Sequence, residues 1–146
     1  MREYHIYLIE EEFATHYFGR ESLIYHLFLE HNQAKYERKE ILNKQIEFIT
    51  RTIPSLRIHQ KIEGSLAHYS YYSRQSHMHT LEWNEFNSFA KLTIHNDYIH
   101  LESTGSYEAE TAFFEILRKY DRCFLAMDFK ANKYGWLNPI KERKFV

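Results

Sequence analysis

The sequence is poor in cysteine, proline and glycine, and it carries almost no net charge. Its 146 residues include one cysteine, two prolines and four glycines. A single cysteine, Cys123, excludes an internal disulfide and is typical of a reducing cytoplasm. So few prolines and glycines argue against long flexible linkers, and a chain of this length can bury a substantial core. We therefore expect residues 1–146 to form one compact cytoplasmic domain.

Further absences exclude classes of function. A formal net charge of −1 gives no electrostatic footprint for DNA or RNA, whose binding depends on neutralising phosphates. No apolar run approaches membrane-spanning length, and the N-terminus lacks the basic and apolar regions of a signal peptide. There is no glycine-rich phosphate loop, no GxSxG and no HExxH. We expect no catalytic residues, no cofactor, no small-molecule substrate, no membrane contact and no direct contact with nucleic acid.

Ten histidines are the one feature that favours metal chemistry. His77 and His79 share one side of an extended segment, and His95 and His100 flank a predicted hairpin turn. No cysteine pair and no carboxylate at a recognised ligand spacing accompanies them. We interpret them as scattered imidazoles and expect no metal site. A small histidine-rich, metal-dependent enzyme stays open as an alternative function.

Aromatic residues are abundant, with twelve tyrosines and eleven phenylalanines. Three of them stand in the stretch EEEFATHYFGRES, whose leading glutamates favour the start of a helix. Phe13 and Tyr17 are four residues apart and share one helix face, while Ala14 and Phe18 form a second such pair. Gly19 is expected to end the helix. The residues alone leave two interpretations open: one wide buried face, or an exposed aromatic pair that binds a partner.

Hydrophobic periodicity predicts an α/β protein, a single compact domain with a small mixed β-sheet and packed helices. Residues 107–120 have apolar side chains at helical spacing, and the apolar run 123–129 that follows is a predicted strand. Strand, helix and strand in this order predict a parallel, right-handed crossover. The segment 55–85 fits either a strand or a helix, with an edge strand and loop toward its end. The other predicted strands are 3–9 and the hairpin 89–103, and the other predicted helices are 21–30 and 35–50.

Two long stretches of the chain carry specific motifs. They are YLIEEEFATHYFGRES and GSYEAETAFFEILRKYDRCFLAMDFKANKYGWLNPIKERKFV, in which FGRES, YEAET, FLAMDF and YGWLNP occur in this order. With these motifs the chain resembles the SirA family of sporulation inhibitors of replication. The similarity is strong toward the two ends of the chain and poor between Ser65 and Phe86. The role of this divergent segment stays open.

The resemblance implies a non-enzymatic regulator of endospore-forming bacteria. SirA-like proteins bind the N-terminal domain (domain I) of the initiator DnaA and restrain chromosome replication as sporulation begins. In that family the DnaA-facing surface includes an aromatic pair on the first helix, which corresponds here to Phe13 and Tyr17. It also includes the proline of the WLNP motif, here Pro139. The implied mechanism is steric: a protein seated on DnaA blocks its productive assembly at the origin.

A direct origin-DNA-binding regulator is the second alternative. It requires a basic face, and the chain offers one set of candidate residues toward its C-terminus: Lys130, Lys133, Lys141, Arg143 and Lys144.

Overall fold

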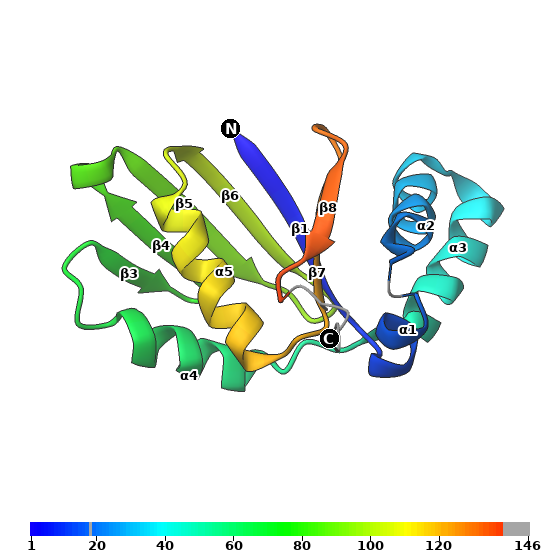
Figure 1. The fold of residues 1–146 in the computed structure, drawn as a ribbon, viewed down its shortest axis with the longest axis horizontal. Coiled ribbons are helices and arrows are strands. Elements are labelled where there is room, and N and C mark those ends of the chain that lie inside the picture. Colours follow the sequence, from blue (N-terminus) through cyan, green and yellow to red (C-terminus); the bar gives the residue numbers. More distant parts are fainter. Residues whose placement is uncertain (18, 139–146) are drawn as a thin grey trace, which may run out of the picture.

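A computed structural model describes residues 1–17 and 19–138, which form helices and strands around one sheet (Figure 1). The helices are α1 (Glu11–His16), α2 (Glu21–Gln33), α3 (Tyr36–Ile49), α4 (Ser55–Leu66) and α5 (Glu108–Tyr120), with a 3₁₀ turn η1 at Asn84–Phe86. The strands are β1 (Arg2–Ile9), β2 (Thr50–Arg51), β3 (Tyr72–Gln75), β4 (Met78–Trp83), β5 (Ser88–Ile94), β6 (Ile99–Gly105), β7 (Phe124–Asp128) and β8 (Lys133–Trp136).

The sheet has the strand order β3-β4-β5-β6-β1-β7-β8, and β2 pairs with the end of β1. Strand β1, which corresponds to the predicted strand 3–9, lies inside the sheet between β6 and β7. The predicted fold class, an α/β protein with helices packed on a sheet, is confirmed.

The predicted strand–helix–strand unit differs in one respect. Strands β6 and β7 run in the same direction, because each pairs antiparallel with β1. However, β1 occupies the position between them, so the two strands are not neighbours. The parallel direction expected of the crossover is therefore found. Within the described residues all strand pairs are antiparallel, so the expected mixed sheet is wrong.

Helices cover the two faces of the sheet unevenly. Helices α4 and α5 lie together beside β3 to β6, whereas α1, α2 and α3 gather at the other end, next to β8 (Figure 1). Tyr4 of β1 contacts Phe114 of α5 edge to face, at a centroid distance of 5.2 Å. Tyr7 contacts Phe28 of α2 at 4.4 Å. Because side chains alternate along a strand, α5 and α2 pack on opposite faces of β1.

The segment 55–85 contains a helix that sequence reasoning did not assign. Pro54 precedes α4, and the apolar residues Ile58, Ile62 and Leu66 follow at four-residue spacing and are buried. Strand β3 is an edge strand, as predicted for the region that follows. The described core residues join in one hydrophobic cluster, which supports a single domain, and its extent over residues 1–146 stays a prediction.

Helix α5 packs through Ala109, Phe113 and Leu117, which are four residues apart and fully buried. The N-cap position of this helix is Tyr107, which makes no side-chain capping bond. The Oγ atom of Ser88 on β5 instead accepts a hydrogen bond from the Ala109 amide at 2.9 Å. A residue of the sheet thus satisfies one of the free amide groups at the start of the helix.

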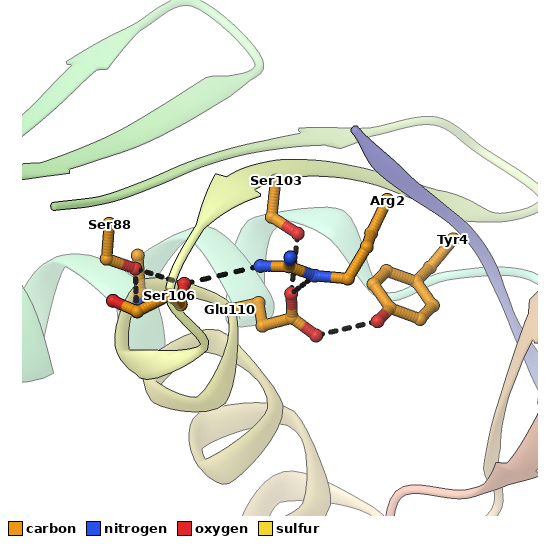
Figure 2. A network of polar contacts seen from close by, with 7 residues as sticks. Arg2, Tyr4, Ser88, Ser103, Ser106 and Glu110 are labelled. Carbon is orange, nitrogen blue, oxygen red and sulfur yellow. Dashed lines mark hydrogen bonds and ion pairs between the residues drawn. The ribbon is translucent and has the colours of Figure 1, made fainter.

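A buried carboxylate also joins α5 to the sheet (Figure 2). Glu110 is only 3% exposed, and it accepts hydrogen bonds from Arg2 Nε, from Tyr4 Oη at 2.7 Å and from Ser103 Oγ at 2.6 Å. Arg2 also donates to the Ser106 carbonyl at 3.2 Å. Burial and the hydrogen bond to Glu110 raise the pKa of Tyr4 above its ordinary range, so its phenol stays a donor. These donors offset the cost of removing a carboxylate from water.

Phe113→Ala should lower the free energy of unfolding by about 3–5 kcal/mol, because it opens a cavity at a fully buried position. Chemical denaturation followed by circular dichroism measures this loss. The matched control is Phe48→Ala, which removes the same atoms from a ring that is 74% exposed and should cost far less. Equal stability of Phe113→Ala and the wild type would contradict the assigned core.

Glu110→Ala should lower the free energy of unfolding by about 2–3 kcal/mol, since three donors lose their acceptor while Arg2 keeps partial access to water. The control is the same substitution at Glu108, which is exposed and lies two residues earlier in α5, and it should have a much smaller effect. Comparable losses at the two positions would show that the Glu110 network does not stabilise the fold.

Candidate partner-binding surface

Helix α1 is short and depends on contacts with the rest of the molecule. It has six residues, and its N-cap, Glu10, makes no side-chain capping bond. Helices of this length are unstable on their own. The Glu10 amide donates to the Ile49 carbonyl at 2.8 Å, and Ala14 packs into the core with 1% exposure. As predicted, Ala14 faces the core, whereas Phe18 lies outside the described residues.

Phe13 and Tyr17 are both half-buried. The Tyr17 amide donates to the Phe13 carbonyl at 2.9 Å. The helical hydrogen bond between residues four apart is thus present at this pair, although α1 ends at His16. Each side chain packs partly against the hydrophobic core. Neither of the two interpretations left open by the sequence, a wide buried face or an exposed aromatic pair, therefore describes them completely. Each has one buried part, which restrains the ring, and one part open to solvent.

A third aromatic ring extends this site. Phe48 of α3 contacts Phe13 edge to face at a centroid distance of 5.5 Å and is 74% exposed. We call Phe13, Tyr17 and Phe48 the aromatic surface. The sequence analysis did not single out Phe48. The signal that could have found it is its seven-residue spacing from Ile41, which is 50% exposed and lies on the same side of α3.

The connection between α1 and α2 is fixed to the end of the sheet. Gly19 adopts a positive φ of 78°, and its amide donates to Glu21 Oε1 at 2.9 Å. The same oxygen accepts a hydrogen bond from Trp136 Nε1 of β8 at 3.0 Å. Burial raises the pKa of Glu21, but hydrogen bonds from its own amide, Gly19 and Trp136 outweigh this effect and lower it overall. Pro139, the third predicted contact residue, lies outside the described residues.

The buried histidines form a structural network. His79 is fully buried, and its Nε2 and Nδ1 atoms lie 2.7 Å from His59 Nδ1 and 2.6 Å from the Tyr72 hydroxyl. Burial, with smaller contributions from His59 and Arg74, lowers the pKa of His79 to about 3. Both ring nitrogens of His79 are thus engaged by protein groups. His77, which the sequence placed on the same side, is exposed.

The remaining chemical candidates also have structural roles. Cys123 is buried, and burial raises the pKa of its thiol, which keeps it unreactive. Asp128 accepts a hydrogen bond from the Ala131 amide at 3.1 Å, so it caps a turn. Among residues 1–17 and 19–138, we find no helix of sufficient length and apolar character to cross a membrane.

The fold and the aromatic surface define a class: small α/β proteins with one antiparallel sheet and a clustered aromatic surface of the type found in protein interfaces. The family model "Sporulation inhibitor of replication protein SirA" matches residues 2–141. A Bacillus subtilis (strain 168) protein of the same description is 44% identical over 147 residues, covering 99% of both chains. The chain belongs to the SirA family, which confirms the resemblance seen in the sequence motifs.

The His79 network predicts a pH dependence of stability. Below its ordinary pKa of 6.5, a histidine in the unfolded chain binds a proton that folded His79 does not bind. The free energy of unfolding should therefore fall as the pH drops from 6.5 toward 3, at up to about 1.4 kcal/mol per pH unit for this group.

His79→Gln should flatten the stability profile between about pH 6.5 and pH 5, as measured by urea denaturation at each pH. His26→Gln, which removes an exposed histidine, should retain the wild-type slope. An unchanged slope in His79→Gln would contradict a neutral, buried His79.

Proposed function

We propose that this protein inhibits the initiation of chromosome replication during sporulation by binding domain I of DnaA. The printed name of the 44% identical relative, a sporulation inhibitor of replication, supports the general function. The observation that carries the proposal in this chain is the aromatic surface, because Phe13 and Tyr17 match the family's partner-binding positions and pack at the edge of the core.

The physical properties of these rings suit an interface anchor. A large ring that is already restrained by its neighbours gives much contact area and loses little rotamer entropy on binding. The edge-to-face contact with Phe48 restrains Phe13 in this way. Partial burial therefore favours the binding role, since a preorganised hot spot binds more tightly than a freely rotating one.

The exposed parts of the aromatic surface are apolar rings, which are enriched at the centres of protein interfaces. The near-neutral charge of the whole chain agrees with a protein partner rather than duplex DNA.

We propose that Pro139 contributes to the same interface. Three residues before it, Trp136 is hydrogen-bonded to Glu21, next to the α1–α2 connection. This bond supports the view that the C-terminal WLNP motif and α1 act on one partner. The mechanism is occupancy: the bound protein covers a surface through which DnaA assembles at the origin, and it needs no catalytic group.

Phe13→Ala and Tyr17→Ala should each weaken binding to isolated DnaA domain I by about 2 kcal/mol or more, roughly thirtyfold. Isothermal titration calorimetry measures this change. Phe48→Ala should weaken binding as well, because Phe13 loses the ring that restrains it. Tyr17→Phe separates the two parts of tyrosine: a small loss shows that the ring binds, and a large loss shows that the hydroxyl pairs in a dry interface.

The matched control is Leu56→Ala, which removes an apolar side chain that is 71% exposed on α4 and should leave binding unchanged. Melting curves must show that the variants remain folded. Normal binding by both Phe13→Ala and Tyr17→Ala would contradict the proposed interface. Tight, salt-sensitive binding of origin DNA by the protein without DnaA would favour the DNA-binding alternative.

A further inference from the structure

The face of the sheet opposite α5 carries a cluster of histidines and glutamates. Glu3 and His5 are two residues apart on β1, so both side chains point to this face. In the register of β1 and β6, His5 lies directly opposite His100, and Glu3 lies opposite Glu102. The two strands thus bring two imidazoles and two carboxylates into a compact square, from positions that are far apart in sequence.

The distances within this square suit a metal ion. One nitrogen of each histidine and one oxygen of Glu3 all lie within 4.8 Å of one another. Glu3 Oε2 is 3.2 Å from His100 Nε2. Two ligands bound to one tetrahedral Zn²⁺ at about 2.0–2.2 Å are separated by about 3.3–3.5 Å. The Glu3–His100 pair is close to this spacing, and His5 offers a nitrogen within 4.8 Å of the ligand atoms of both residues.

The surroundings of the cluster support this arrangement. Glu102 Oε1 faces the other nitrogen of His100, Nδ1, at 3.7 Å, and a carboxylate behind a ligating histidine is typical of zinc sites. His5 packs between the rings of Tyr98 and Phe129, at centroid distances of 5.6 and 5.3 Å. Its Nδ1 atom is buried without a hydrogen-bond partner.

The exposure of the cluster also suits a ligand role. The side chains of His100 and Glu3 are 20% and 27% exposed, so the cluster is open to solvent and accessible to an ion.

We propose that Glu3, His5 and His100 form a binding site for a divalent transition-metal ion, Zn²⁺ by ligand type, with Glu102 orienting His100. Two imidazoles and one carboxylate leave a coordination position for water. The site joins β1 to β6 and is separate from the aromatic surface. It does not depend on the proposed binding of DnaA.

The test is a zinc titration of the full chain without a histidine tag, in competition with a chromophoric zinc indicator. We expect one equivalent to bind. His5→Gln, His100→Gln and Glu3→Gln should each weaken binding by more than about 100-fold, and Glu102→Gln by about 10- to 100-fold, as for outer-shell partners. Zinc should also raise the melting temperature of the wild type but not that of His100→Gln.

The control is His26→Gln, which removes an exposed histidine on α2 and should bind zinc like the wild type. If His5→Gln fails to fold, His100→Gln and Glu3→Gln carry the test at the more exposed positions. Unchanged zinc affinity in His100→Gln would overturn the proposal. So would the absence of saturable binding in the wild type, which would leave His100 as an ion-pair partner of the two glutamates.

Discussion

The arrangement of helix α5 on the sheet depends on the hydrogen bonds of the buried Glu110 carboxylate. A carboxylate in an apolar layer is costly unless donors surround it. Arg2 and Tyr4 on β1 and Ser103 on β6 supply those donors (Figure 2). The network therefore requires β1 beside β6 and α5 above both strands. It stabilises β1, the first strand of the chain, beside β6, in the position that β7 would take in a simple crossover.

The position of β1 in turn fixes the aromatic surface. Strand β1 ends at Ile9 and leads directly into α1, and the Ile9 amide donates to the Cys123 carbonyl at 3.0 Å. At the next residue the Glu10 amide is bonded to the end of α3. The start of helix α1 is therefore held both to the sheet and to α3, the helix that carries Phe48. A surface held in this way pays little ordering entropy when a partner binds.

Local sequence patterns predicted those parts of the fold that local interactions specify. The alternation in β1, the β5–β6 hairpin and the apolar spacing of α5 were all correct, because each is set by residues close in sequence. Helix α4 was left open between strand and helix, because Gly64 and polar residues such as Lys61 obscured its four-residue apolar spacing. The position of β1 between β6 and β7 was not predicted, because no local pattern states which strand fills a position in a sheet.

The same distinction applies to the candidate sites. Family motifs identified Phe13 and Tyr17, but the partial burial of Phe13 depends on Phe48, which lies on another helix. The spacing of Glu3 and His5 was visible in the sequence, whereas their proximity to His100 depends on the β1–β6 register. The sequence therefore predicted which residue types could form a site and how they are spaced along each element. It did not predict the register that brings residues of different strands together.

The two faces of β1 differ in how strongly folding constrains them. Tyr4, Ile6 and Leu8 face α5 or the core beneath it, and their identities follow from packing and from the Glu110 network. On the other face α2 covers Tyr7, whereas Glu3 and His5 remain only partly covered. An open sheet face is stable with any set of β-forming or oppositely charged side chains. Two histidines opposite each other, beside two opposed glutamates, are therefore more than the fold requires, and a ligand is the simplest reason for placing them together.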